Sequence, residues 1–228
     1  MATPRLIAVD GPAGAGKSTI GALVGERLGY LFLDTGAMYR AVALVALERG
    51  VSTEDGPTLA ELAREANLSV GPATVRDGRT YTVLLGGRDV TWAIRDAAVD
   101  RVVSQVARHP EVREAMLAQQ RRYAERGRVV MVGRDIGTVV LPDADLKVFL
   151  TASANERARR RGEELAARGV VRARQELLHE ILRRDQLDSE RAVAPLRAAE
   201  DAVVIDTEGH TVGEALERVM HVIASRSR

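Results

Sequence analysis

The 228-residue sequence predicts an α/β fold with a doubly wound, five-stranded parallel sheet. Two observations predict it. Short, nearly continuous apolar runs have the composition of strands buried on both faces, and segments of helical periodicity alternate with these runs. That alternation is typical of sheets covered by helices on both sides. The apolar fraction of 46% is enough for a sizeable core.

The individual elements follow from these patterns in chain order. The predicted core strands are residues 6–9, 30–33, 129–132, 146–150 and 202–205. The predicted helices are residues 17–28, 37–49, 96–108, 110–126, 155–168, 172–187 and 211–225. Pro110 suits the first position of its helix, where the N–H that proline lacks would have no partner.

One stretch between the second and third core strands departs from the alternation. Segments 80–85 and 88–91 flank Gly86 and Gly87, and this pattern indicates a β-hairpin. Residues 67–70 could add a third short strand. We therefore expect a single domain over residues 1–228 with a small α+β insertion, whose β part spans about residues 66–95.

Charge and composition exclude several classes of protein. The net charge of +1 argues against a strongly basic nucleic-acid surface, and the absence of cysteine excludes disulfides, thiolate zinc sites and cysteine nucleophiles. No segment resembles a signal peptide or reaches the roughly 20 apolar residues of a membrane span. We expect a cytoplasmic monomer with no nucleic-acid or membrane partner.

Residues 11–18, Gly-Pro-Ala-Gly-Ala-Gly-Lys-Ser, match the phosphate-binding pattern G-x-x-x-x-G-K-[ST]. Glycines let the backbone turn its N–H groups toward phosphate oxygens, and the helix that follows presents its positive end. Lys17 can reach the β- and γ-phosphates, and the Ser18 hydroxyl can ligate Mg²⁺. The pattern directly follows an apolar strand and opens an amphipathic helix, so we expect nucleoside triphosphate binding. Alone, it does not distinguish a kinase from a GTPase switch or a motor.

A second segment, residues 34–40, follows the second predicted strand with the sequence Asp-Thr-Gly-Ala-Met-Tyr-Arg. Ligands of open α/β sheets gather at the carboxyl ends of the strands. Arg40 would therefore project near the phosphate loop, where a second anion could sit. The alternative is a solvated arginine on a helix that Asp34 or Thr35 caps.

A third segment, residues 133–138, follows the third predicted strand at the same edge with the sequence Gly-Arg-Asp-Ile-Gly-Thr. Arg134 could hold a phosphate, and Asp135 could accept hydrogen bonds from a base or a sugar. The alternative is a structural ion pair.

Two arginine-rich tracts follow the fourth predicted strand. The first tract opens a helix with Arg157, Arg159, Arg160 and Arg161. Basic residues in a first helical turn oppose the helix dipole, a cost that a bound anion would offset; the alternative is a solvated helix face. The second tract, residues 183–191, looks like a helix that ends in a charged loop and is equally consistent with solvated surface.

Taken in order, these segments resemble the bacterial cytidylate kinases. The matching stretches are GPAGAGKST (11–19), LDTGAMYR (33–40), SQVARHPEVRE (104–114), GRDIGTVV (133–140) and RAVAPL (191–196). The resemblance implies a phosphate-loop kinase fold and a nucleoside monophosphate kinase that phosphorylates CMP or dCMP with ATP and Mg²⁺, giving CDP or dCDP and ADP. It also implies a monophosphate-binding region over about residues 36–125 and a helical lid over about residues 156–171.

The resemblance also implies roles for individual residues. The ATP phosphates would lie on Gly11, Pro12, Ala13, Gly14, Ala15, Gly16, Lys17, Ser18 and Thr19. CMP would lie among Arg40 and Arg134 at its phosphate, Thr35, Arg113, Asp135 and Arg191 at its base, Ser104, Arg184 and Asp188 near its sugar, and Tyr39. The catalytic residues would be Lys17, Arg134, Arg157 and Arg161.

These roles suit the chemistry of the ligands. The exocyclic amine of cytosine is a donor that Asp135 can accept, and its O2 and N3 are acceptors for Arg113 or Arg191. Val132 stands where many members of this family carry a carboxylate, so we expect Ser18 as the direct protein ligand of Mg²⁺. Thr35 replaces the serine common in the family and keeps its hydroxyl.

We expect in-line transfer without a general base, because the acceptor phosphate is already ionised near neutral pH and the four histidines fall outside the motifs. Two alternatives remain. A kinase of the same fold could act on UMP or another metabolite. A GTPase-like switch would need an N-K-x-D segment, and neither lysine of the chain fits that pattern.

Overall fold

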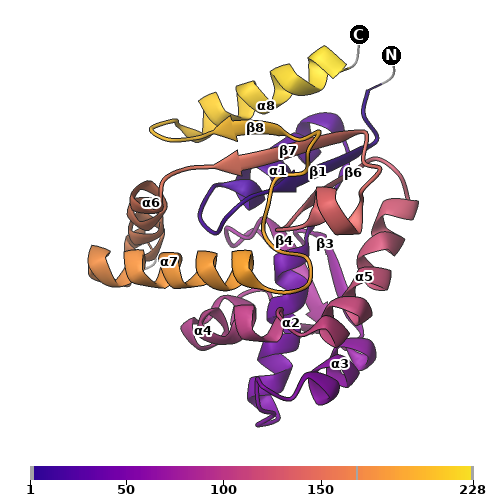
Figure 1. Cartoon of the computed structure of the whole chain (residues 1–228), viewed down its shortest axis with the longest axis vertical. Coiled ribbons are helices and arrows are strands. Elements are labelled where there is room, and N and C mark those ends of the chain that lie inside the picture. Colours follow the sequence, from indigo (N-terminus) through magenta and orange to yellow (C-terminus); the bar gives the residue numbers. More distant parts are fainter. Residues whose placement is uncertain (1–2, 168, 227–228) are drawn as a thin grey trace.

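The structure, a computed structural model, describes residues 3–167 and 169–226 and has a five-stranded parallel sheet at its centre (Figure 1). The strand order is β2-β6-β1-β7-β8, and every neighbouring pair is parallel. The strands are β1 (Leu6–Asp10), β2 (Leu31–Asp34), β6 (Val129–Val132), β7 (Leu146–Thr151) and β8 (Val203–Asp206). The predicted fold class and its core strands are confirmed.

Helices cover both faces of this sheet. One face packs against α1 (Lys17–Leu28) and α8 (Val212–Arg226), and the other packs against α2 (Thr35–Glu48) and α5 (Pro110–Glu125). Side chains of β1 alternate between the two cores, because successive residues of a strand point to opposite faces. Ile7 and Val9 pack with α1 and α8, whereas Ala8 packs with α2.

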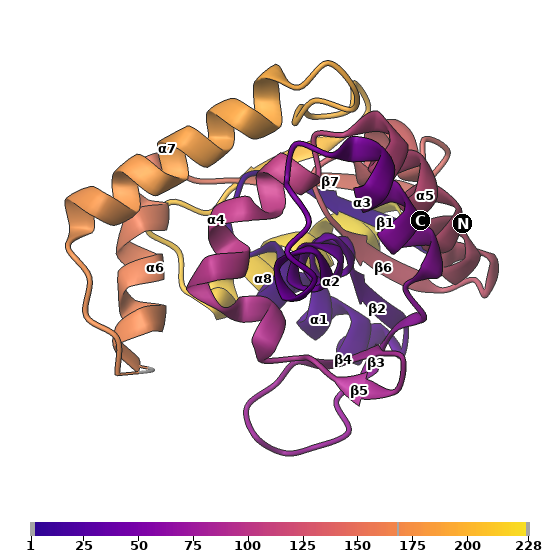
Figure 2. The ribbon, with the colours of Figure 1, turned by 90° about the horizontal axis from the view of Figure 1, so that it is seen from below.

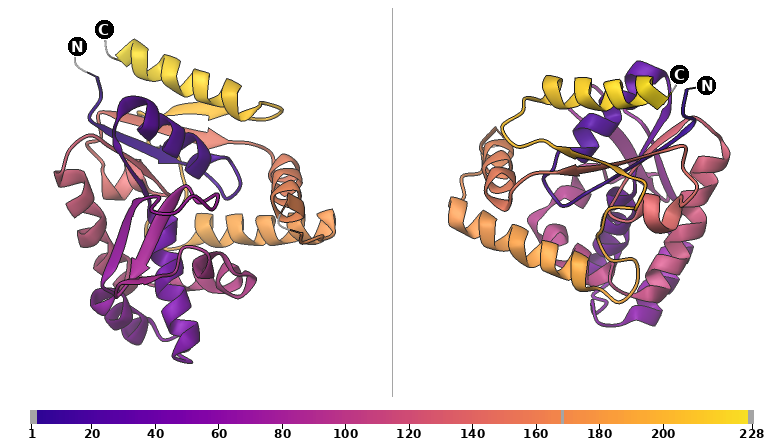
Figure 3. Two further views of the ribbon diagram at one scale, coloured as in Figure 1. Left: turned by 180° about the vertical axis from the view of Figure 1, so that it is seen from behind. Right: turned by 45° about the horizontal axis from the view of Figure 1, so that its top comes forward.

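Four further helices of the described residues lie outside these two layers. They are α3 (Gly56–Glu65), α4 (Ala97–Val106), α6 (Ala154–Ala167) and α7 (Arg174–Glu190). Among them, α3 packs against α5 and α2. Figures 1 and 3 show that α6 follows the carboxyl end of β7 and that α7 returns from α6 toward α4. This arrangement brings residues from α2, α4, α6 and α7 to one side of the sheet.

A separate antiparallel sheet comprises β3 (Leu68–Pro72), β4 (Tyr81–Leu85) and β5 (Arg88–Asp89). Gly86 and Gly87 have φ of 57° and 84°, the left-handed values that a two-residue hairpin turn favours. β3 packs against β2, and Figure 2 shows the small sheet beside that strand. The predicted hairpin and its third strand are confirmed.

Three local features differ from the prediction. Helix α3 was not predicted, although Asp55 caps it by accepting a hydrogen bond of 3.1 Å from the Thr58 amide. The predicted charged loop after residue 187 is wrong: α7 continues through Glu190 and carries the charged residues on helical turns. Residues Ile136–Val140 form a short π-helical segment.

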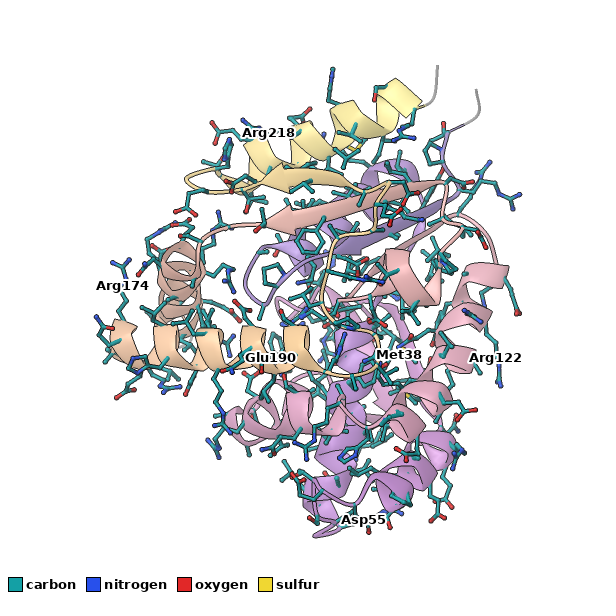
Figure 4. All side chains as sticks on the ribbon, in the orientation of Figure 1. Met38, Asp55, Arg122, Arg174, Glu190 and Arg218 are labelled. Atoms are coloured by element: carbon teal, nitrogen blue, oxygen red, sulfur yellow. The ribbon has the colours of Figure 1, made fainter. Side chains whose placement is uncertain are left out.

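Some predicted positions fall at the edges of what the structure describes. Arg168, assigned to the end of the helix now seen as α6 and to the predicted lid, lies outside the described residues. Within residues 3–167 and 169–226, no helix has the length and apolarity needed to cross a membrane. The outer surfaces carry many charged side chains, such as Arg174 on α7 and Arg218 on α8 (Figure 4).

Candidate active site

The phosphate loop joins β1 to α1 and lies tightly against β7. Gly11, Gly14 and Gly16 have φ of 142°, 77° and 87°, which L-residues with side chains rarely adopt. A Cβ at Gly11 would lie 2.0 Å from the Leu150 carbonyl oxygen, so only glycine allows this approach to β7. Gly16 precedes the helix without a side-chain cap. The first N–H groups of α1 are therefore open to an anion.

Lys17 points back into this loop. Its Nζ donates a hydrogen bond of 2.6 Å to the Pro12 carbonyl, and its side chain is buried. Burial lowers the pKa of Lys17 well below its usual value, and the nearby charge of Arg134 lowers it further. Val9 pairs in register with Val132, and the Gly133 amide donates to the Val9 carbonyl over 3.0 Å, so Arg134 follows β6 at the edge where the phosphate loop begins.

Ser18 and Asp34 bring oxygen atoms together beside Lys17. The Ser18 hydroxyl donates a 2.7 Å hydrogen bond to Asp34 Oδ2, which also accepts one of 3.1 Å from the Tyr81 hydroxyl. Asp34 Oδ1 caps α2 at the Gly36 amide, the role that the sequence predicted for this residue. Hydroxyl and carboxylate oxygens are ligands that Mg²⁺ prefers, so these residues fit the predicted metal.

The metal would depend on the nucleotide for its other ligands. Among the described residues, no group of three or more histidine, cysteine or acidic side chains could hold a metal ion alone. Mg²⁺ in phosphoryl-transfer sites usually binds one or two protein oxygens together with phosphates and water. Asp34 pairs in register with Val132, so a carboxylate from β2 lies beside the position where the family often has one on β6.

Asp10, which the sequence analysis did not single out, fixes the segment after β6. Its carboxylate accepts hydrogen bonds of 2.7 Å from the amides of Ile136 and Gly137. Burial raises the pKa of Asp10 to about 6, and the two amides oppose that rise. Asp10 directly precedes the phosphate loop at the end of a buried strand, and this position is the sequence signal that could have identified it.

Four arginines from four different segments gather opposite the phosphate loop; we call Arg40, Arg134, Arg161 and Arg184 the arginine cluster. Asp100 on α4 holds three of its members, with N–O distances of 2.5 Å to Arg40, 2.6 Å to Arg161 and 3.5 Å to Arg184. The fourth, Arg134, donates from Nε to Asp188 on α7 over 2.9 Å. The sequence predicted the arginines and Asp188 but not Asp100.

The arginine cluster has more positive than negative charge. Four guanidinium groups face two largely buried carboxylates, Asp100 and Asp188, and Arg161 also pairs with the half-exposed Glu164. Burial, together with the charges of Arg40 and Arg134, lowers the pKa of Arg184 to about 10. The buried Arg184 Nε has no hydrogen-bond partner within the described part of the chain. A dianionic phosphate would balance the excess charge and supply the missing acceptor.

A cavity of about 180 Å³ has a lining that includes Arg113, Gln120 and Val193 together with Tyr39 and Asp135, the chain neighbours of Arg40 and Arg134 in the cluster. Its volume is below the roughly 300 Å³ at which pockets for drug-sized ligands begin, so it has room only for a small group. Arg113 forms a buried ion pair with Asp135 and also lies over the Tyr39 ring, 5.4 Å from its centroid.

Three further residues, Arg191 and Thr35 with predicted roles at the base and Ser104 with a predicted role near the sugar, lie on separate segments. Arg191 Nη2 lies 3.6 Å from Asp135 Oδ1 and, although buried, makes no hydrogen bond within residues 3–167 and 169–226. The Thr35 hydroxyl donates to the Val132 carbonyl over 2.9 Å, which leaves its oxygen free to accept. Ser104 is half-buried on α4, one turn beyond Asp100. Of these residues, Arg191 contacts a residue of the cavity lining, Asp135.

The arginine side chains of α6 contact different parts of the structure. Arg157 donates to the Ala13 carbonyl over 3.1 Å and pairs with Asp185 of α7, so it links the phosphate loop to that helix. Arg160 donates to the Thr207 hydroxyl, and Arg159 pairs with Glu156 on its own helix. The structure therefore places Arg161 in the arginine cluster and Arg157 beneath the phosphate loop.

A family model described as cytidylate kinase matches residues 7–225. Curated proteins named cytidylate kinase from Pelotomaculum thermopropionicum and Geobacillus kaustophilus are 53% and 52% identical over 220 residues. Those alignments cover 96% of this chain, and 94% and 96% of the respective relatives.

Among solved structures, a gluconokinase from Sinorhizobium meliloti 1021 has a similar fold. Its TM-score is 0.51 at 17% identity, over 100% of this chain and 95% of that chain. This likeness concerns the fold alone, whereas the family model and the curated relatives match nearly the whole sequence. The chain belongs to the cytidylate kinase family.

Proposed function

We propose that this protein transfers the γ-phosphoryl group of ATP to CMP or dCMP, which gives ADP and CDP or dCDP. One observation carries the proposal: Tyr39 and Asp135 of the cavity lining are the chain neighbours of Arg40 and Arg134 in the arginine cluster, and the charge of Arg134 acts on Lys17. A pyrimidine in the cavity would direct its 5′-phosphate into the cluster. The family name of the relatives supports the same activity.

Base recognition follows from the charges of the cavity. Among the described residues, Asp135 Oδ1 has the 3.6 Å ion pair with Arg191 as its one charged contact, so it can accept a hydrogen bond from the exocyclic amine of cytosine. UMP carries a carbonyl at that position, which would face the carboxylate oxygen without a proton between them. We therefore expect CMP and dCMP to be preferred over UMP.

Catalysis on this proposal consists of positioning and charge stabilisation. The phosphate loop and Lys17 would hold the donor phosphates, Arg40 and Arg134 would hold the acceptor phosphate, and Arg157 and Arg161 would act from α6. The acceptor oxygen is ionised near neutral pH, so no side chain needs to remove a proton. Mg²⁺, held by Ser18 and the nucleotide with Asp34 beside them, would neutralise phosphate charge when bound.

The proposal also assigns roles to larger segments. Residues 36–125 would form the monophosphate-binding region, and α6 would belong to a lid. Arg161 of α6 reaches Asp100 of α4 over 2.6 Å, so these two parts already meet in the structure. A lid that closes over both nucleotides would exclude water and limit the hydrolysis of ATP.

The direct test is phosphate transfer from ATP to CMP, dCMP, UMP and AMP, measured in parallel. We expect CMP and dCMP to exceed the other acceptors in kcat/KM by at least about tenfold, roughly 1.4 kcal/mol of discrimination. Asp135→Ala should lose this preference while the Kd for ATP stays near that of the wild type. Equal activity on all four acceptors would contradict the proposed substrate, and an equal loss of CMP use and ATP binding would give Asp135 a structural role.

A further inference from the structure

Asp100 has no assigned role in the proposed reaction, yet its carboxylate contacts three members of the arginine cluster. It comes from α4, and its partners come from α2, α6 and α7. Oδ1 accepts from Arg40 at 2.5 Å and faces Arg184 at 3.5 Å, while Oδ2 accepts from Arg161 at 2.6 Å. Both carboxylate oxygens are therefore engaged with arginines.

Two of these arginines, Arg40 and Arg161, already donate hydrogen bonds from both of their terminal nitrogens. Arg40 donates from Nη1 to the Ile94 carbonyl over 3.1 Å and from Nη2 to Asp100. Arg161 donates from Nη1 to Glu164 over 2.8 Å and from Nη2 to Asp100. Arginine binds a phosphate most strongly when two parallel N–H groups donate to it. A phosphate that binds here in that way must compete with Asp100 for the same nitrogens.

The two anions also repel each other. Asp100 is largely buried, so the surrounding water screens its charge only in part. Burial raises the pKa of Asp100, but the charges of Arg40, Arg184 and Arg161 outweigh burial and leave the pKa below its usual value. Asp100 is therefore ionised near neutral pH and would lie within the same group of guanidiniums as a dianionic acceptor.

We propose that Asp100 is a positioning residue that holds the place of the acceptor phosphate. In the unliganded enzyme it gathers Arg40, Arg161 and Arg184 and so ties α6 and α7 to the acceptor side. The phosphate of CMP takes over these arginines and releases Asp100. This inference rests on the proposed function, because it needs the arginine cluster to bind the acceptor phosphate.

The experiment compares Asp100→Asn with the wild-type protein, without ATP, by calorimetric titration with CMP and with inorganic phosphate. We expect both ligands to bind about 3- to 10-fold more tightly, because a competing charge is gone. Hydrogen exchange of the α6 amides should become faster in the unliganded variant and return to the wild-type rate with CMP bound. Asp100→Glu, which keeps the charge, should restore wild-type affinity and exchange.

Two matched controls separate this effect from general electrostatics. Asp96→Asn removes an exposed carboxylate one turn earlier, and Glu164→Gln removes the other carboxylate that contacts Arg161. Neither should tighten binding of CMP or phosphate by more than about 1.5-fold, since a surface charge pair contributes little. Should Asp100→Asn not fold, Asp100→Ser is measured instead, because it also leaves an uncharged acceptor.

Weaker or unchanged binding of CMP and phosphate in Asp100→Asn, or in Asp100→Ser where it replaces that variant, would overturn the inference. Weaker binding would mean that Asp100 orients the arginines for the ligand, and unchanged binding would leave an ordinary ion pair. Arg40→Ala distinguishes this failure from failure of the proposed function. If Arg40→Ala weakens CMP binding at least about tenfold, the cluster binds the acceptor and only the role of Asp100 is contradicted. If Arg40→Ala leaves CMP binding unchanged, the proposed role of the cluster itself is contradicted.

Discussion

Lys17 is a buried ammonium group with a backbone carbonyl as its hydrogen-bond acceptor at 2.6 Å. Such a group is poorly solvated and can exchange that acceptor for phosphate oxygens at little cost. We expect Lys17→Met, which keeps most of the side-chain volume, to lower kcat at least about 100-fold, or roughly 2.7 kcal/mol in the activation barrier. The measurement is ATP-dependent phosphorylation of CMP, with thermal unfolding to check the fold.

Lys147, the other lysine of the chain, provides the control for that variant. Its Nζ pairs with Asp201 over 2.9 Å, and no role in the site is proposed for it. Lys147→Met should lower thermal stability but change kcat by less than about twofold, as expected for loss of a pair with one exposed partner. Similar losses of kcat in both variants would show that Lys17 acts through stability alone.

Asp10 gives a prediction about pH. Its pKa in the folded protein is raised to about 6 from 3.8, mainly by burial. The folded state therefore holds this proton more tightly than the unfolded state, so this contribution favours folding at low pH and is lost as pH rises through about 4 to 6. The total change is on the order of 3 kcal/mol.

The test compares the free energy of unfolding of the wild type and Asp10→Asn at several pH values. Between pH 4 and 6 the wild type should lose stability relative to the variant, because asparagine does not titrate. The pKa values of Asp100 and Asp188 are lowered, so these residues change stability with pH in the opposite direction. Their contributions are the same in both proteins and cancel in the comparison. A difference that does not change with pH would contradict the raised pKa.

Sequence patterns predicted the residues of the site that belong to compact motifs. Lys17 and Ser18 follow from the spacing of the phosphate loop, and Arg134 follows from its place at a strand end. Asp10 and Asp100 escaped prediction because their partners are distant in sequence: Asp10 accepts from an amide 126 residues away, and Asp100 pairs with an arginine 60 residues away. Only the folded chain shows such pairs.

At the scale of elements, the joint between β1, the phosphate loop and β7 depends on the absence of a side chain at Gly11. An alanine there would need a φ near 142° and a Cβ 2.0 Å from the Leu150 carbonyl oxygen. We expect Gly11→Ala to lower the free energy of unfolding by at least about 3 kcal/mol, because both strain and a clash contribute. Denaturant unfolding monitored by circular dichroism measures this loss.

Gly29 is the matched position for that test. It also has a left-handed φ, 66°, but a Cβ there would meet nothing within 4 Å among the described residues. Gly29→Ala should therefore cost only about 1 kcal/mol, the conformational penalty alone. Equal losses at Gly11 and Gly29 would show that the contact with β7 does not constrain the loop.

Elements with a strong local pattern were predicted well, and those fixed by distant contacts were not. The core strands and the hairpin at Gly86 follow from composition and turn chemistry. The end of α7 could not be predicted in this way. Its last turns make ion pairs with residues distant in sequence, such as Asp188 with Arg134 and Asp185 with Arg157. Helix α3 carried a recognisable cap at Asp55, so its omission was a missed signal.

At the scale of the whole molecule, the strand order decides which residues meet. β1 lies between β6 and β7, so the phosphate loop emerges beside the segment that carries Arg134 and Asp135. The alternation of strands and helices predicted a parallel sheet, but it does not specify this order. The long crossovers through α2, α4 and α7 then bring the arginine cluster to the same edge.

The central claim is that donor and acceptor phosphates lie end to end between Lys17 and the arginine cluster. The most direct measurement is calorimetric binding of a compound in which adenosine and cytidine are joined 5′ to 5′ by five phosphates. It should bind at least about 100-fold more tightly than ATP or CMP, because one molecule fills both sites, and Arg134→Ala should weaken it at least about tenfold. Binding no tighter than that of ATP, and unaffected by Arg134→Ala, would contradict the account.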